Sequence, residues 1–234
     1  MNAMRRRLSV GLAAVFWAIC WGGTATAHRP VFPDGDASAW QNAIQIDRPA
    51  VSQVVYYELQ GQELRLWLTF VADAGFEVFL QLGLPKIDRL ADYRPSFALL
   101  GSGFEPIDLP FDTPEGLGGR VFTTEDVSDP RVFHETFTDT TSWIVKEVTV
   151  TLPQSGRYYV VAWPNGDAAD KLWLSIGREE TFGLGDLFLF DDWTGQARQF
   201  HEVPPALFFG IPCFLLTVLP LLFLSLSPKL LSGR

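Results

Sequence analysis

The chain has 234 residues, of which 47% are hydrophobic and 19% charged, and its formal net charge is −9. This length fits one ordinary domain with accessory segments, and the apolar fraction excludes a chain that is disordered throughout. The acidic balance excludes a basic nucleic-acid-binding surface as the default interpretation. Two cysteines are too few for a small domain built on disulfides.

The first 27 residues have the pattern of a secretory signal peptide. Arg5, Arg6 and Arg7 form a positive region, residues 8–20 are mostly apolar, and residues 24–27 supply small side chains for cleavage. Cleavage after Ala27 makes His28 the first residue of the mature chain. An uncleaved anchor is the alternative, although the apolar stretch is shorter than the ~20 residues that a membrane span needs.

Short runs of β-branched and aromatic residues, separated by turn-forming residues, predict strands in two clusters. In the second run of the first cluster, Leu64, Leu66, Leu68 and Phe70 occupy every second position and therefore share one face, and Trp67 shares the other face with Arg65 and Thr69. The first cluster comprises residues 53–59, 63–71, 76–82 and 96–100. The second comprises residues 144–152, 157–163 and 171–177.

Strands without helical patterns between them favour an all-β fold, and we expect an antiparallel β-sandwich over residues 28–182. The stretch between the clusters, residues 101–141, is rich in Pro, Gly, Asp and Thr. It is long for a loop without structure, and such loops are usually functional or contain short strands. Residues 121–124 are a candidate for such a strand.

Residues 183–203 are a predicted juxtamembrane segment in which large apolar residues, among them Trp193 and Phe200, alternate with acidic ones. One interpretation is an interfacial helix with Trp193 at the depth of the lipid headgroups. The alternative is a segment that packs beneath the sandwich.

Residues 204–228 contain no charged residue, and we predict a transmembrane helix there. The apolar stretch 207–226 is twenty residues long, enough to span a hydrocarbon core of ~30 Å. Lys229 and Arg234 lie in the last six residues, 229–234, which suit a cytoplasmic tail. A C-terminal sorting tail that is removed after export is the alternative.

The segment between the signal and the span carries all the acidic residues. Of the 18 Lys and Arg residues, three lie in the signal and two in the tail, so residues 28–203 hold 13 basic against 27 acidic residues, a net charge of −14. Such a surface repels nucleic acid and anionic lipid. After processing, Cys213 within the predicted span is the one cysteine left, so the exported domain has no disulfide.

Histidine and carboxylate residues are the candidates for metal binding. The α-amine and ring nitrogen of an N-terminal His28 can chelate copper together, and His134 or His201 would add a second imidazole. Calcium is the other candidate ion, at Asp34 and Asp36 or at a cluster of carboxylates between residues 125 and 129. Solvated turns are the alternative interpretation of both acidic groups.

No catalytic motif accompanies these residues. The sequence contains no nucleophile elbow, phosphate-binding loop, dinucleotide fingerprint or zinc motif. His134 and Glu135 have the chemistry of a general acid–base pair, but a surface loop anchored by Phe133 and Phe137 is the alternative. We therefore expect no enzyme activity, no catalytic residue and no resident cofactor.

Four tryptophans lie on or beside predicted strands. On an exposed sandwich face, such side chains could stack on sugar rings, and core packing is the alternative. The four residues are Trp67, Trp143, Trp163 and Trp173.

Residues 152–162, Leu-Pro-Gln-Ser-Gly-Arg-Tyr-Tyr-Val-Val-Ala, followed by Lys-Leu-Trp-Leu-Ser-Ile-Gly at 171–177, resemble the last strands of bacterial prepeptidase C-terminal β-sandwich domains. Residues 52–70 resemble the opening hairpin of these domains. The layout of signal, sandwich and one membrane helix is also similar to uncharacterised bacterial envelope proteins, with Gly177, Glu180 and Phe182 matching a motif before the span. The resemblance implies a jelly-roll-like sandwich with an accessory or binding role, and no catalytic residues.

We therefore expect a bacterial, single-pass type I membrane protein whose sandwich lies on the extracytoplasmic side. Its expected role is that of a binding or assembly module, with the bilayer as one partner and another envelope protein or a glycan as the second. The loop at residues 101–141 and exposed aromatic residues would make the contacts. A copper-handling protein that uses His28 is the competing hypothesis.

Overall fold

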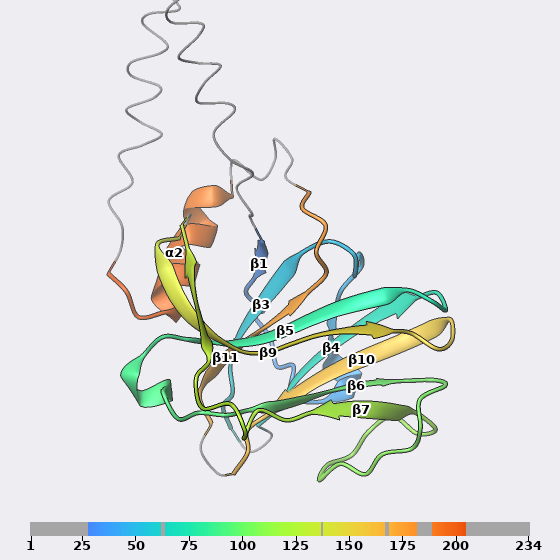
Figure 1. The fold of residues 1–234 in the computed structure, drawn as a ribbon. Helices are drawn as coiled ribbons and strands as arrows, with labels where there is room; N and C mark the ends of the chain where they lie inside the picture. The colour runs from blue at the N-terminus through green and yellow to red at the C-terminus, as the bar shows by residue number, and fades with distance from the viewer. Residues whose placement is uncertain (1–27, 62–63, 137, 167–168, 182–188, 205–234) are drawn as a thin grey trace, which may run out of the picture.

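The computed structural model describes residues 28–61, 64–136, 138–166, 169–181 and 189–204. They form two facing β-sheets and one α-helix (Figure 1), so the predicted β-sandwich is confirmed. The predicted signal lies outside the described residues, as does the predicted span except for Pro204. Among the described residues, no helix is long and apolar enough to cross a membrane.

Each sheet is named here with its strands in spatial order. Sheet A consists of β1 (Arg29–Val31), β3 (Gln53–Glu58), β11 (Lys171–Ile176), β5 (Glu77–Pro85), β9 (Thr140–Thr151) and β8 (Arg131–Glu135). Sheet B consists of β2 (Ile44–Gln45), β4 (Leu66–Ala72), β10 (Gly156–Trp163), β6 (Ser96–Gly101) and β7 (Gly118–Phe122). The helix, α2 (Phe190–Phe200), lies over sheet A (Figure 1).

Two strand pairs correct the expectation of an entirely antiparallel fold. β1 runs parallel to β3, with Arg29 opposite Gln53, and β2 runs parallel to β4, with Ile44 opposite Leu68. Strands of two or three residues are too short to show an alternating pattern in the sequence. Parallel neighbours need a crossover connection, which residues 32–52 provide by passing from sheet A to sheet B and back.

The turn at Gln60 and Gly61 does not form the expected hairpin. β3 belongs to sheet A and β4 to sheet B, so the chain crosses between the sheets at this turn. It crosses again between β9 and β10 and between β10 and β11. Strands that follow one another in the chain therefore often lie in opposite sheets and face the same core. Many hydrogen-bonded neighbours are distant in the sequence.

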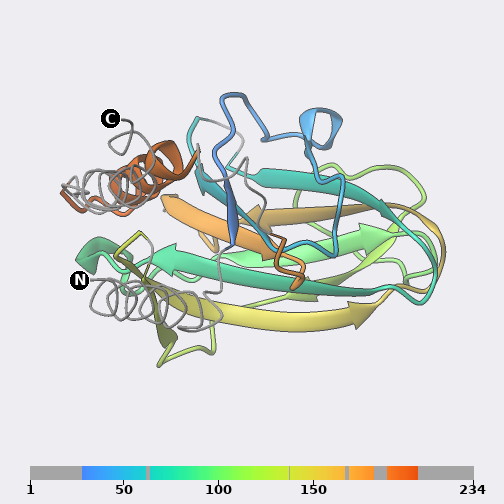
Figure 2. The ribbon, with the colours of Figure 1, turned by 90° about the horizontal axis from the view of Figure 1, so that it is seen from above.

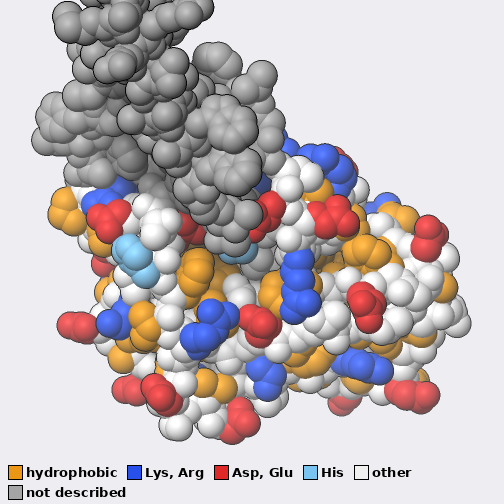
Figure 3. Space-filling model, turned by 45° about the horizontal axis from the view of Figure 1, so that its top comes forward, with side chains coloured by type: hydrophobic (Ala, Val, Ile, Leu, Met, Phe, Trp, Pro, Cys, Tyr) orange, Lys and Arg blue, Asp and Glu red, His pale blue; other side chains and the backbone are white. Residues whose placement is uncertain are grey.

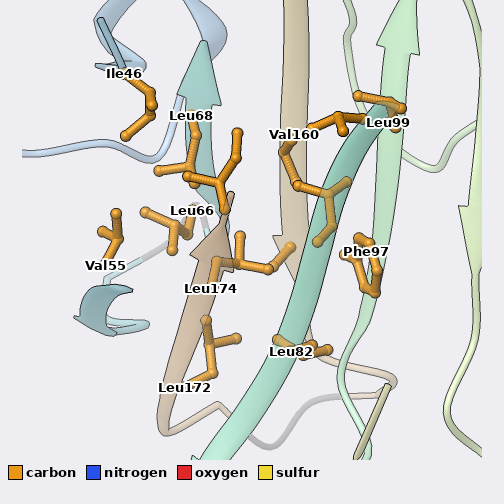
Figure 4. Packing of buried hydrophobic residues seen from close by; sticks show 14 of the residues in the cluster. Ile46, Val55, Leu66, Leu68, Leu82, Phe97, Leu99, Val160, Leu172 and Leu174 are labelled. Atoms are coloured by element: carbon orange, nitrogen blue, oxygen red, sulfur yellow. The ribbon is translucent and has the colours of Figure 1, made fainter. Parts of the chain in front are cut away.

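The core between the sheets is built from the alternating residues of the sequence. In β4, Leu66, Leu68 and Phe70 are fully buried and face the core, as the pattern predicts. Leu82 of sheet A and Val160 of sheet B point into the same space (Figure 4). Each such side chain contributes roughly 1.5–3 kcal/mol when fully buried.

Both outer faces of the sandwich are also covered. On sheet A, Phe200 of α2 packs against Val54, Ile144 and Trp173. On sheet B, apolar residues of the segment 102–117 and of the 3-10 helix η1 (Trp40–Asn42) pack around Trp67. A second 3-10 helix, η2 (Asp88–Leu90), follows β5. The predicted long loop therefore contains β7 and β8, and its remaining first part covers sheet B.

Gly83 of β5 lies opposite Trp173 of β11, and the indole ring occupies the space where a side chain would be. A Cβ atom on Gly83 would lie 2.0 Å from Cζ2 of Trp173, which is far inside van der Waals contact. The absent side chain of Gly83 therefore determines where Trp173 lies on the outer face of sheet A.

We predict that Gly83→Ala lowers the free energy of unfolding by about 1–3 kcal/mol, because the new methyl group displaces the indole of Trp173. Urea unfolding monitored by tryptophan fluorescence measures this change. Gly35→Ala is the control, since a Cβ there meets nothing within 4 Å. Equal stability of the two variants would contradict the proposed steric constraint.

Candidate functional site

A chain of hydrogen bonds fastens the C-terminal end of α2 to sheet A. Trp173 Nε1 donates to the hydroxyl of Ser142 over 3.1 Å, and this hydroxyl lies 2.9 Å from His201 Nε2. His201 Nδ1 lies 2.8 Å from the carbonyl oxygen of Ala197. Because a carbonyl only accepts, the network assigns the proton to Nδ1, and Nε2 accepts from Ser142.

The imidazole of His201 is held uncharged. Its exposed fraction is 5%, and burial lowers its pKa to about 4, with a smaller contribution in the same direction from the positive charge of Lys171. The hydrogen bond to Ala197 opposes this shift. His201 Nδ1 bonds a main-chain carbonyl rather than a carboxylate, and Ser142 is buried. The pair therefore lacks the third group and the access of a hydrolytic triad.

Arg198 makes a second connection, to the turn between β8 and β9. Its side chain is buried, and Nη1 donates to the carbonyl of Thr138 over 2.8 Å and to the Asp139 carboxylate over 3.2 Å. Nε donates to the carbonyl of Pro204 over 2.8 Å. One guanidinium group thus joins α2, the β8–β9 turn and the chain that leaves the helix.

Glu202 makes the third connection, just after α2. Its carboxylate accepts two hydrogen bonds from Arg89, of 2.8 and 2.6 Å, and one of 2.8 Å from Lys171 Nζ. Arg89 also pairs with Asp170 over 2.8 Å. The hydrogen bonds from Arg89 and then from Lys171 lower the pKa of Glu202 to about 2. The network joins the segment after β5, the start of β11 and the segment after α2. Its exposure to water limits the contribution of each ion pair.

In the described part of the predicted juxtamembrane segment, residues 189–203, Phe200 and His201 contact sheet A. Thr194 and Ala197 of α2 are buried, whereas Trp193 is half-buried. The guanidinium carbon of Arg29 lies 5.9 Å from the centre of the Trp193 ring. α2 and β1 are therefore neighbours at one end of the molecule (Figures 1 and 2).

The structure does not bring the candidate metal ligands His28 and His134 together. His28 Nδ1 is hydrogen-bonded to the hydroxyl of Ser52, and its ring lies edge-on to Phe133, with 6.3 Å between centroids. Phe133 and His134 are adjacent in β8 and therefore point to opposite faces. Burial lowers the pKa of His28, and the negative charge of Glu180 offsets part of this shift.

His134 is half exposed and faces Thr141, with 3.3 Å between Nδ1 and the hydroxyl oxygen. Glu135, the next residue of the strand, points to the other face, so the two do not form the general acid–base pair considered above. Within the described ranges, no group of three or more His, Cys, Asp or Glu side chains is arranged to hold a metal ion. Copper binding at the N-terminus stays a prediction.

One of the acidic groups considered for calcium has a structural role. The carboxylate of Asp36 accepts hydrogen bonds from the amide of Ser38 over 2.9 Å and from the side chain of Asn42 over 3.0 Å. The hydrogen bonds to Ser38 and then to Asn42 lower the pKa of Asp36. The carboxylates of Glu125, Asp126 and Asp129 are exposed.

The tryptophans are not arranged as an exposed stacking surface. The exposed fractions of Trp67 and Trp173 are 1% and 4%, so for these two the core-packing alternative is confirmed. Trp143 and Trp163 are half-buried. Trp67 and Trp173 lie on outward faces that the segment 102–117 and α2 cover.

Two surface cavities are lined by residues that the structure describes. One of about 410 Å³ lies on the outer face of sheet B, beside Trp67 and between η1 and residues 110–112. The other, of about 560 Å³, lies between the chain at residues 32–36, the strand β3 and Phe200. Neither was evident from the sequence, because each is lined by segments that are distant along the chain.

Comparison with known proteins adds little to this picture. No family model matches the chain, and a search of curated proteins also finds no match. Among solved structures, the chain is similar to the pre-peptidase C-terminal domain of a collagenase from Bacillus anthracis. The two share 10% identity with a TM-score of 0.30, over 56% of this chain and 91% of that domain.

We predict that the His201 imidazole makes the fold less stable as the pH falls from about 6.5 to about 4. In this range the unfolded chain binds a proton at His201 while the folded chain does not, which costs up to about 3 kcal/mol. Urea unfolding at several pH values measures the slope. His201→Gln should flatten it, whereas His134→Gln, at a half-exposed position, should not. Equal slopes for His201→Gln and the unmodified chain would contradict this role.

Proposed function

We propose that the chain is a non-enzymatic binding or assembly module of the bacterial cell envelope. Its C-terminal segment, residues 204–228, anchors it in the cell membrane as a single-pass type I protein, with the sandwich on the extracytoplasmic side. The attachment of α2 to sheet A carries this proposal, since α2 directly precedes the uncharged segment.

The contacts of α2 extend to the point where the predicted span begins. Arg198 binds the carbonyl of Pro204, and Glu202 is bonded to Arg89 and Lys171. A span that starts at this point would therefore leave the sandwich from a fixed position. This supports a domain mounted firmly at the membrane, in preference to one that hangs from a flexible linker.

The surface charge of the sandwich suits an aqueous compartment. Acidic and basic side chains are interspersed on the face shown in Figure 3, within a segment whose net charge is −14 over residues 28–203. Such a surface supports solubility next to a membrane and disfavours attachment to anionic headgroups.

The order of the strands supports the jelly-roll part of the expected fold. β3, β11, β5 and β9 in sheet A face β4, β10, β6 and β7 in sheet B, and most consecutive strands lie in opposite sheets. Sandwiches of this connectivity commonly serve as binding domains, such as lectins. This association concerns fold alone, and the binding role rests on the anchor and on the lack of a catalytic arrangement among the described residues.

The copper-handling alternative has less support. A chelate at an N-terminal histidine uses the ring nitrogen nearer the backbone, and in the structure this nitrogen of His28 is bonded to Ser52. Copper would have to displace that hydrogen bond. The hypothesis predicts copper binding at one ion per chain that is lost when a residue is added before His28.

Membrane fractionation tests the proposed function. We expect the full chain, expressed in a bacterium, to remain in membranes after an alkaline carbonate wash. In spheroplasts the sandwich should be cleaved by added protease. A chain that ends at Pro204 should be released as a soluble exported protein. The proposal would be overturned if the full chain were soluble. It would also be overturned if the sandwich in spheroplasts resisted protease added outside the inner membrane.

We predict that Arg198→Ala loosens α2 and leaves the sandwich folded, because the variant removes the bonds to the β8–β9 turn and to Pro204. Amide hydrogen exchange should become at least tenfold faster in residues 190–203, which corresponds to about 1.4 kcal/mol, and stay unchanged in β4 and β5. Arg131→Ala is the control, since its ion pair with Glu147 is exposed. Unchanged exchange in α2 would contradict the role of Arg198.

A further inference from the structure

We propose that the cavity on the outer face of sheet B binds a saccharide. The proposal rests on the binding function above and names the class of ligand. The cavity has a volume of about 410 Å³ and lies between η1, β4 and residues 110–112. Small-molecule sites in proteins commonly have volumes of 300–1,000 Å³, and one or two sugar rings fit within such a space.

Aromatic side chains form part of the wall, which is otherwise largely polar. Trp40, Trp67 and Phe111 line the cavity. The rings of Trp67 and Phe111 meet edge to face with centroids 6.0 Å apart, and both Trp67 and Trp40 make similar contacts with Tyr159, at 6.2 and 6.4 Å. These mutual contacts fix the rings before a ligand arrives. The rings of Trp40 and Phe111, which are half-buried, give the apolar C–H groups of a sugar a surface to pack on.

The indole N–H of Trp67 supplies a donor that the protein does not use. Trp67 has an exposed fraction of 1%, and its Nε1 atom is buried without a hydrogen-bond partner among the described residues. Leaving a buried donor unpaired costs about 1–3 kcal/mol. The oxygen of a hydroxyl, ring ether or acetamido group in the adjacent cavity is the kind of acceptor that would remove this cost.

Two charged side chains line the cavity and balance each other. The guanidinium carbon of Arg65 lies 4.9 Å from the centre of the Phe111 ring, and Arg65 Nε donates to the carbonyl of Ser38 over 3.3 Å. Burial lowers the pKa of Arg65, and the negative charge of Asp112 offsets part of this shift. A guanidinium and a carboxylate together serve hydroxyl groups, which both accept and donate hydrogen bonds.

The charges favour an uncharged ligand over an ionic one. Arg65 and Asp112 leave the cavity close to neutral, and the net charge of −14 over residues 28–203 opposes the approach of anions. A polyhydroxylated neutral ligand matches the aromatic wall, the unpaired indole donor and the balanced ionic pair at once.

The cavity is also well placed for display. It lies on sheet B, whereas α2 lies over sheet A (Figure 1). A saccharide bound there would face away from the attachment of α2. This arrangement leaves the ligand side of the domain accessible when the chain is held at a membrane.

Fluorescence titration and calorimetry of the full chain in detergent test the proposal. The neutral probes are glucose, galactose, maltose and N,N′-diacetylchitobiose, each at up to about 10 mM, above the Kd of a weak millimolar ligand. Inorganic phosphate and choline chloride are the ionic probes. We expect at least one neutral probe to bind and to shift tryptophan emission, and both ionic probes to fail.

Two variants locate the binding. Trp40→Ala removes part of the aromatic wall and Asp112→Asn removes the carboxylate, and each should raise the Kd of the bound sugar at least tenfold. Asp112 is exposed, so Asp112→Asn remains informative if Trp40→Ala does not fold, which circular dichroism would show. Trp193→Ala on α2, at the other sheet, is the control and should leave the Kd unchanged.

Three outcomes overturn the inference. They are no binding of any neutral sugar, binding of phosphate or choline that Asp112→Asn removes, and sugar binding that both cavity variants leave intact. None of these outcomes changes the result that the proposed function predicts for the membrane fractionation. A chain that is membrane-held and exported but binds no sugar refutes this inference alone, whereas a soluble cytoplasmic chain refutes the proposed function whatever the sugar titration shows.

Discussion

The attachment of α2 to sheet A depends on the contact between the indole of Trp173 and Gly83, which has no side chain. This contact sets the indole flat on sheet A, and the indole N–H then meets the hydroxyl of Ser142. That hydroxyl is left to donate to His201, which in turn holds the last turn of α2 through Ala197. A side chain on Gly83 would disturb every bond that follows. The position of α2 is thus determined by a residue more than a hundred positions earlier in the chain.

The two outer faces of the sandwich are covered in different ways. α2 covers part of sheet A with a helix whose end is tied by Arg198 and Glu202 to three connections of the fold. The segment 102–117 covers sheet B with apolar side chains but leaves a cavity beside Trp67. The face of sheet A holds buried polar bonds and a cavity beside Phe200, and the face of sheet B retains an unpaired donor and a pair of opposite charges.

The sequence predicts the strands in which apolar residues alternate with others. In such a strand every second residue faces the core and must be apolar. β4 and β5 follow this rule over their inner faces. The rule does not reveal β1 and β2, which are too short to show alternation. It also does not say to which sheet a strand belongs, so the prediction of a hairpin at Gly61 is wrong. The roles of Ser142 and His201 were missed because their partners are distant in sequence. Burial of Trp67 and Trp173 depends on covering segments that carry no periodic signal of their own.

The pairing of β3 with β11 has a consequence for how the chain reaches its native state. Gln53 lies opposite Ile176, so β3, the first long strand of sheet A, pairs with β11, the last strand. The loop between them must be closed before the contact forms, and proteins dominated by such distant pairs fold slowly. During synthesis, the edge of β3 that pairs with β11 stays unpaired until nearly the whole domain has been made. The exposed edge of β3 during that interval makes the incomplete domain prone to aggregation.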